Sequence, residues 1–355
     1  MNVLMLIFSI FSIIGILDAI TGNHFGLGEE FEKGIKLVGA LTLSMLGMIC
    51  LVPLINELIS PAIVPISSFL HIDPSIFSAM LIANDMGGAA LSSELAVNES
   101  IGSFNATVVS AMMGVTISFT LPTVLKTTPE SSHKHVILGL LSGVSTIPVG
   151  CFVAGLMLKL HPIALIVDLI PLLIFSSVII FGLIKAPKIS VKIVSVFGKL
   201  LFALIMLGLG LAILEAMTGY TPIKGLAPAS ESYEMLFKLA FMLSGVFPLI
   251  SILSRLLKKP LGYLSKKTGL DETSSLGLLT TLASSIPTFG LVEKMSPRGI
   301  VINMAFAVSA AFALGDHLAF TVMFASSYAA AVVVGKLISG ISAIVVAYFV
   351  SRKIN

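Results

Sequence analysis

The chain consists of long apolar stretches separated by short polar connections, and the length of these stretches predicts membrane-spanning helices. A run of about 20 apolar residues is long enough to cross the hydrocarbon core of a bilayer. Eleven such segments can be drawn, at residues 2–20, 34–58, 74–97, 104–125, 136–160, 162–184, 193–217, 234–258, 273–295, 299–320 and 327–350. The pattern predicts an all-α polytopic membrane protein.

Two of these segments are interrupted near the middle by polar and turn-forming residues. The sequence NDMGG (84–88) interrupts the segment at 74–97, and SSIPTFG (284–290) interrupts the one at 273–295. Each interruption leaves two apolar pieces of about ten residues, which as helices span about half of the hydrocarbon thickness. Each segment is therefore either a re-entrant hairpin or one discontinuous helix, and the sequence leaves both open.

The interruptions occupy related places in an internal repeat. LDAITG at 17–22 matches LEAMTG at 214–219, and LSGVSTIPV at 141–149 matches ISGISAIVV at 338–346, both at an offset of 197. Small gaps also bring together the pairs Asp73 and Asp271, Asn105 and Asn303, and the two interruptions.

This repetition predicts the domain organisation. Residues 1–160 are expected to be one five-element repeat, residues 193–355 a second copy, and residues 161–192 a connecting transmembrane helix. Broken helices in paired repeats are typical of secondary transporters.

Positive charges predict how the two copies are oriented. If the interrupted segments enter and leave on one side, nine crossings remain, and nearly all loop lysines and arginines fall on one face. Lys159 and Lys224 alone lie opposite. The favoured face holds Lys33, Lys126, Lys134, Lys185, Lys188, Lys192, Arg255, Lys258, Lys259, Lys266, Lys267, Lys294, Arg298, Arg352 and Lys353. The positive-inside rule then predicts inverted repeats, with the N-terminus outside and the C-terminus cytoplasmic.

Composition excludes several other classes of protein. The chain is 56% hydrophobic and 11% charged, and its mean hydropathy is +1.07, which is unlike a soluble domain. The net charge is only +3, and the basic residues lie in short clusters between apolar runs, which indicates membrane topology rather than nucleic-acid binding. Cys50 and Cys151 fall in apolar runs and are read as buried hydrophobes, so we expect no disulfide and no metal. No phosphate-binding Walker loop is present, and we expect no cofactor.

The first interruption supplies the strongest binding-site candidates. Gly87 and Gly88 allow the backbone to turn and approach a ligand closely. Asp85 offers a negative charge where a small cation could lie, with Asn84 beside it. A helix cap or a hydrogen bond between hairpin arms is the purely structural alternative.

The second interruption and the following segment supply the other candidates. Hydroxyls in the interruption can bond a ligand hydroxyl or cap the broken helix ends, and intramembrane polar groups need a partner. Asp316 follows Gly315 near the end of segment 299–320, and His317 could tune it or relay a proton. The candidate residues are Ser284, Ser285, Thr288, Phe289, Asn303, Asp316 and His317.

Three classes of function fit these features to different degrees. The interrupted repeats favour a carrier, although a passive channel can also be built from half-helices. Two intramembrane aspartates could instead form an aspartyl protease, since Ala313-Leu314-Gly315-Asp316 approaches a GxGD motif. That motif fails at its first glycine, and Asp85 follows Asn84 where a tyrosine would be expected.

Several long motifs resemble one known family. These are DMGG and ELA (85–88 and 94–96), STIPVGC (145–151), IPTFG (286–290) and RGIVINMAFAVSAAFALGDHL (298–318). Over nearly its whole length the chain resembles the ethanolamine transporter of the bacterial ethanolamine-utilisation system. The resemblance implies import of ethanolamine across the cytoplasmic (inner) membrane. It also implies a functional link to ethanolamine-degrading enzymes, and oligomerisation stays open.

The implied substrate matches the candidate residues. Ethanolamine carries an ammonium group at neutral pH, as lysine does, together with a hydroxyl. We expect the ammonium near Asp85 and Asp316, with Phe289 available for cation–π contact. The hydroxyl would meet Ser284, Ser285, Thr288 or Asn303.

Overall fold

The described part of the chain is all-helical, as the sequence predicts. The computed structural model describes residues 3–268 and 270–352, with the side chains of 231 and 257–268 excepted. The basic residues Lys258, Lys259, Lys266, Lys267 and Lys353 of the expected charge pattern lie outside these described groups.

Eight helical stretches within the described residues are long and apolar enough to cross a membrane. They are Val3–Ile20, Leu27–Leu70, Glu99–Thr127, Glu130–Met157, Pro162–Lys185, Pro187–Thr218, Ser232–Leu256 and Asp316–Ser351. The chain is therefore a multi-pass membrane protein. Neither interrupted segment is among these stretches, because each is divided into helices too short to span.

The first interrupted segment is a re-entrant hairpin, hereafter hairpin 1. It contains α4 (Ser75–Leu81), a 3₁₀ turn (Asn84–Met86) and α5 (Gly88–Leu95). Asp73 closes its base, because one carboxylate oxygen accepts from the Ser75 amide at 3.0 Å and the other from the Val97 and Asn98 amides at 3.0 and 2.8 Å. The segment thus begins and ends at the same place.

The second interrupted segment closes in the same way and is called hairpin 2. It contains α13 (Glu272–Ala283), α14 (Ser285–Gly290) and a 3₁₀ turn (Val292–Lys294). Asp271 accepts from the Ser274 amide at 2.8 Å and from the Ser296 amide at 3.0 Å. Both segments are therefore hairpins, which settles the alternative that the sequence left open. The inverted relation of the two halves stays a prediction.

The expected single segment at 299–320 is wrong, because the helix is broken before Asp316. Helix α15 (Pro297–Ala310) stops, residues 311–315 form turns and bends, and α16 (Asp316–Ala325) begins. The Phe312 amide donates to Thr281 O at 3.1 Å and the Leu314 amide to Leu282 O at 2.9 Å. Pairing with hairpin 2 replaces the helical hydrogen bonds of this stretch.

The segment predicted at 104–125 stays helical, but part of it is π-helical. It comprises α6 (Glu99–Phe104), the π-helical stretches η3 (Asn105–Gly114) and η4 (Thr116–Thr120), and α7 (Leu121–Thr127). At Gly114 an added Cβ would lie 2.2 Å from Ile82 O of hairpin 1. The Ala83 amide donates to Ser118 Oγ at 3.1 Å. The π-helical segment therefore lies directly against the tip of hairpin 1.

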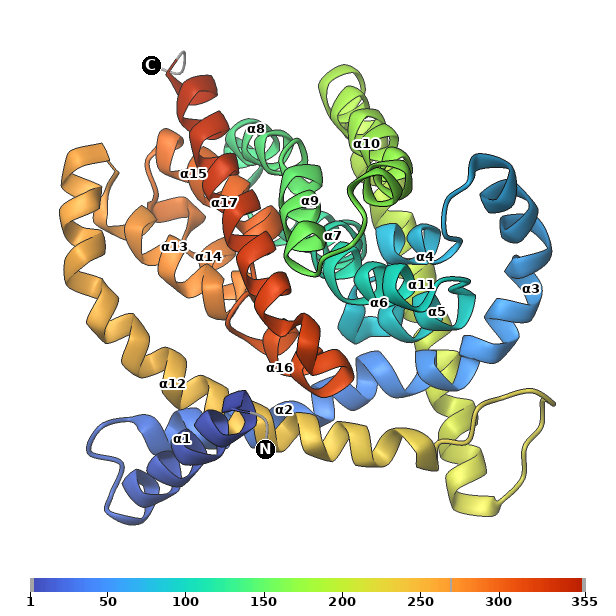
Figure 1. The fold of residues 1–355 in the computed structure, drawn as a ribbon. Helices are drawn as coiled ribbons and strands as arrows, with labels where there is room; N and C mark the ends of the chain where they lie inside the picture. The colour runs from blue at the N-terminus through green and yellow to red at the C-terminus, as the bar shows by residue number, and fades with distance from the viewer. Residues whose placement is uncertain (1–2, 269, 353–355) are drawn as a thin grey trace.

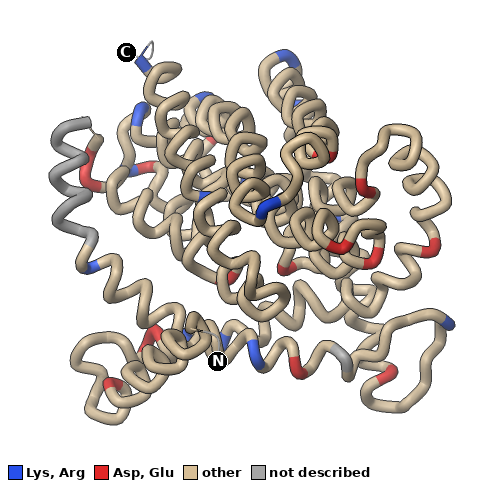
Figure 2. Tube along the Cα trace, in the orientation of Figure 1, with Lys and Arg blue, Asp and Glu red and all other residues tan. Residues whose placement is uncertain are grey.

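The two hairpins lie on opposite sides of a central group of helices (Figure 1). This group includes α8 (His133–Val144), α9 (Ile147–Met157) and α17 (Ala329–Ser351). The remaining long helices are α1 (Val3–Ile20), α2 (Leu27–Leu41), α3 (Gly47–Leu70), α10 (Pro162–Lys185), α11 (Pro187–Thr218) and α12 (Ser230–Thr268). The start of α1 and the end of α17 lie toward opposite ends of the molecule in this view. Charged residues are sparse along the central helices (Figure 2).

Candidate functional site

A small cavity lies where the tips of both hairpins meet. Its volume is about 170 Å³. Asp85 comes from hairpin 1, Ser284 from hairpin 2, and Asp316 and His317 from the start of α16. The apolar lining residues are Leu37, Ala83, Met86, Val115, Phe119, Phe247, Ala283, Ile286 and Phe312. The cavity therefore joins chemistry from segments that are far apart in the sequence.

Asp85 is held in the cavity by the turn that follows it. The short 3₁₀ turn at 84–86 ends at Gly87, whose φ of 90° lies in the left-handed region that favours glycine. An added Cβ at Gly87 would lie 2.2 Å from Met48 Cγ, and one at Gly88 would lie 2.2 Å from Ile82 O. The glycines shape the tip, and the Asp85 side chain keeps 16% of its surface exposed.

Asp316 and His317 enter the cavity because the helix is broken before them. Asp316 is the first residue of α16, where the helix dipole favours a carboxylate. Its Oδ1 accepts from the His317 amide at 2.9 Å. The ring of His317 is buried, with Nε2 at 3.7 Å from Asp85 Oδ1. Phe312, at a φ of 61°, stacks on that ring at 5.0 Å between centroids.

Several of the predicted site residues lie away from the cavity lining. Asn84 is buried, and its amide nitrogen and oxygen have no hydrogen-bond partner among the described residues. The buried Ser285 hydroxyl is also unpartnered there. Thr288 Oγ1 donates to Gly277 O at 2.9 Å inside hairpin 2.

Two further candidates belong to the supporting structure. Asn303 Nδ2 donates to Ser274 O and Gly299 O, each at 2.9 Å, at the base of hairpin 2. Phe289 is buried in a hydrophobic core cluster and does not line the cavity. The aromatic rings at the cavity are instead those of Phe119, Phe247 and Phe312.

One buried charge that sequence reasoning missed lies behind the cavity. Lys336 on α17 is fully buried. Its Nζ donates to Ala111 O at 2.5 Å and lies 3.3 Å from His317 Nδ1. The sequence does show a lysine inside an apolar segment, and ionisable residues within membrane helices are often functional.

A second buried polar network connects hairpin 1 to α10. Asp168 Oδ1 accepts from the Asp73 amide at 3.1 Å, and Oδ2 accepts from Asn105 Nδ2 at 3.0 Å. Asn105 Nδ2 also donates to Ser75 Oγ at 2.9 Å. These residues hold the base of hairpin 1 and lie outside the cavity lining.

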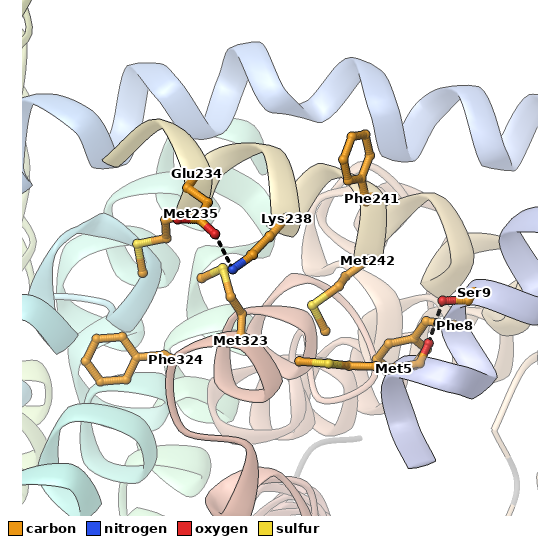
Figure 3. A pocket seen from close by; sticks show the side chains of 10 residues that line it. All are labelled: Met5, Phe8, Ser9, Glu234, Met235, Lys238, Phe241, Met242, Met323 and Phe324. Atoms are coloured by element: carbon orange, nitrogen blue, oxygen red, sulfur yellow. Dashed lines mark hydrogen bonds and ion pairs between the residues drawn. The ribbon is translucent and has the colours of Figure 1, made fainter. Parts of the chain in front are cut away.

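A larger cavity of about 640 Å³ lies elsewhere, between α1, α12 and α16 (Figure 3). It is lined mostly by methionine and phenylalanine side chains. Its charged residues pair with each other, since Lys238 Nζ lies 2.5 Å from Glu234 Oε1. Ser9 Oγ donates to its own helix at Met5 O. The smaller cavity, which holds two aspartates, is therefore the stronger candidate for binding a polar cation.

Comparison with known proteins identifies the family. The model of a family described as "Ethanolamine utilisation protein, EutH" matches residues 1–350. A probable ethanolamine permease EutH of Listeria monocytogenes is 41% identical over 344 residues, covering 97% of this chain and 92% of its own length. An uncharacterized protein YxeR of Bacillus subtilis is 36% identical, with 95% and 91% covered.

A probable ethanolamine permease EutH of Escherichia coli is 35% identical, with 92% of this chain and 86% of its own length covered. No solved structure matches the chain. The Listeria and Escherichia relatives are named as probable permeases and not as enzymes, which speaks against the aspartyl protease alternative. The chain belongs to the EutH family of ethanolamine utilisation proteins.

Proposed function

We propose that the protein imports ethanolamine across the bacterial cytoplasmic membrane through the cavity between the hairpin tips. The observation that carries the proposal is that Asp85 and Ser284, from the tips of two different hairpins, line one cavity with Asp316. The family and the names of the relatives support the choice of substrate. In this proposal the N-terminus lies outside and the C-terminus in the cytoplasm.

The chemistry of the cavity suits a small amino alcohol. An ammonium group needs carboxylate acceptors, which Asp85 and Asp316 supply. The rings of Phe119, Phe247 and Phe312 offer faces for cation–π contact. The hydroxyl of Ser284 can pair with the hydroxyl of the substrate. A volume of about 170 Å³ accommodates a molecule of this size together with water.

The proposed mechanism is alternating access. The repeats at 1–160 and 193–355 would be inverted copies joined by the connecting helix, and the bundle that carries both hairpins would move relative to the rest. The matching closure of the two hairpins by Asp73 and Asp271 supports this arrangement.

Uptake of labelled ethanolamine into proteoliposomes tests the substrate and the site together. We expect uptake by the wild type and a loss of at least tenfold in Asp85→Asn, because the main acceptor of the ammonium is neutralised. Glu99→Gln is the matched control, since Glu99 is exposed at the start of α6. Wild-type rates in Asp85→Asn would remove Asp85 from the site.

A second measurement separates a carrier from a passive channel. A carrier accelerates efflux of labelled ethanolamine when unlabelled ethanolamine is present on the opposite side, because the loaded site returns faster than the empty one. Single-channel currents without this trans-acceleration would replace the carrier mechanism with a pore.

A further inference from the structure

Lys336 is a charged residue that the proposed substrate contacts do not use. It lies on α17 and is fully enclosed by protein. Ionisable groups inside a membrane protein are costly, and those that occur face the bundle interior and pair with other polar groups. The groups that contact the Lys336 ammonium therefore indicate which part of the protein its charge affects.

The ammonium group of Lys336 is directed toward the candidate site. It donates to Ala111 O at 2.5 Å, in the π-helical stretch η3, and lies 3.3 Å from His317 Nδ1. A charged lysine only donates hydrogen bonds, so with Lys336 protonated Nδ1 is the acceptor and the ring proton is assigned to Nε2. That nitrogen faces Asp85 Oδ1 at 3.7 Å. One imidazole ring thus connects Lys336 to Asp85.

The connecting ring is held in place by its surroundings. Phe312 stacks against His317 with an angle of 30° between the ring planes. Phe119 packs edge-on against Phe312 at 5.8 Å between centroids. Lys336 itself does not line the cavity. Its influence on a bound ligand must therefore pass through His317 and through its electrostatic field.

The charged groups around Lys336 give the site a defined balance. Asp85 of hairpin 1 and Asp316 of α16 are the carboxylates whose charge acts on Lys336. When both carboxylates and the ammonium of Lys336 are ionised and His317 is neutral, these groups together carry one net negative charge. Without Lys336 they would carry two.

On the basis of the proposed function, we infer that Lys336 is a positioning residue, a fixed cation that acts on Asp85 through His317 and restricts the cavity to ligands with a single positive charge. A bound diamine with two positive charges would leave these groups and the ligand with a net positive charge. Removal of Lys336 would leave a site whose two carboxylates match a dication.

Competition binding with two matched amines tests this inference. Labelled ethanolamine bound to the purified full-length protein is displaced by 3-aminopropan-1-ol or by 1,3-diaminopropane, which have the same chain length but one and two positive charges. We expect the wild type to prefer the amino alcohol by at least tenfold. Lys336→Gln, which removes the charge but keeps an N–H donor, should shift this ratio at least tenfold toward the diamine.

Two variants separate charge from structure. Lys336→Arg keeps the positive charge and should retain the wild-type ratio. Lys199→Gln removes an exposed lysine of α11 and should leave the ratio unchanged. A purely structural role of Lys336 would weaken both competitors in parallel, and the ratio would not move.

The inference is overturned by a wild-type ratio near one, or by an unchanged ratio in folded Lys336→Gln. If Lys336→Gln is not monodisperse, Lys336→Met provides a neutral variant of similar shape. The wild-type preference for the amino alcohol over the diamine remains a test that needs no variant. Absence of ethanolamine binding to the wild type would reject the proposed function itself, before any variant is compared.

Discussion

His317 Nε2 lies 3.7 Å from Asp85 Oδ1, and this approach joins the tip of hairpin 1 to the start of α16. Because Asp316 directly precedes His317, the same approach brings a second carboxylate to the cavity. The break at 311–315 makes this approach possible, because it allows a new helix to begin at Asp316. The charge of the cavity therefore depends on two elements at once.

Asp316→Asn should weaken ethanolamine binding roughly 10- to 100-fold, because a hydrogen bond to a charged group is worth about 1.5–3 kcal/mol. Asp85→Asn should have an effect of similar size. The double variant should lose less than the product of the two, since both carboxylates serve one ligand. Equilibrium binding to the purified protein measures all three, and an Asp316→Asn variant with wild-type affinity would contradict the shared site.

Phe247→Leu should weaken apparent affinity about 2- to 5-fold, because a cation–π contact contributes about 0.5–1 kcal/mol at a partly exposed site. Phe289→Leu is the informative comparison. Phe289 lies in the core rather than at the cavity, so its replacement should lower thermal stability without changing affinity. Transport assays over a range of substrate concentrations separate these effects. A loss of affinity in Phe289→Leu and not in Phe247→Leu would place Phe289 in the binding site.

Asp271→Asn should lower stability at neutral pH by about 1–2 kcal/mol, because the carboxylate closes hairpin 2. Burial raises the pKa of Asp271, but hydrogen bonds from Ser274 and Ser296 outweigh it and lower the pKa to about 2. The folded pKa lies below the unfolded one, so the stabilisation is present above about pH 4 and is lost as the pH falls toward 2.

Thermal unfolding in detergent as a function of pH checks this expectation for Asp271. The difference between wild type and Asp271→Asn should shrink as the pH falls from 5 toward 2. Glu272→Gln, at the exposed neighbouring position, is the control. A difference that stayed constant with pH would show that the carboxylate charge is not what holds the hairpin.

Gly87→Ala should abolish or strongly reduce transport. A residue with a Cβ at a φ of 90° costs about 1–2 kcal/mol, and the added carbon would also lie 2.2 Å from Met48 Cγ. Gly39→Ala is the matched control, because nothing lies within 4 Å of its added Cβ on α2. That variant should keep activity and gain up to about 1 kcal/mol of stability, measured by thermal unfolding beside uptake.

Cysteine labelling with a membrane-impermeant reagent should place the two ends of each hairpin on one side of the bilayer. His71→Cys and Glu99→Cys flank hairpin 1, and Glu272→Cys and Glu293→Cys flank hairpin 2. The inverted repeat predicts that the first pair is labelled from outside and the second from the cytoplasm. Labelling of both pairs from the same side would exclude the inverted arrangement while leaving the hairpins intact.

The sequence predicts the helical class, the two interrupted segments and the position of Asp85 because glycines, prolines and isolated charges in apolar runs are visible one residue at a time. It does not predict the break at 311–315. That stretch, AFALG, contains a single glycine, and it leaves the helix because Phe312 and Leu314 find carbonyl partners on hairpin 2. Such tertiary hydrogen bonds leave no local pattern.

Other parts of the site escaped prediction for related reasons. The π-helical register of η3 is a property of hydrogen bonding that composition does not encode. Lys336 was visible as an intramembrane charge, but its contact with His317 depends on how α17 packs against α16. Phe289 was placed at the tip by its sequence neighbours, whereas its ring turns into the core.

The contact of Asp168 with the base of hairpin 1 couples this hairpin to α10. Asp168 lies on α10, the connecting helix in the proposed organisation, and it accepts hydrogen bonds from the Asp73 amide and from Asn105. Displacing hairpin 1 must therefore drag α10 along or expose a buried carboxylate. In the described part of the chain, Asp271 takes its hydrogen bonds from Ser274 and Ser296 of its own half. Hairpin 1 is thus tied through a buried carboxylate to a helix that hairpin 2 does not share.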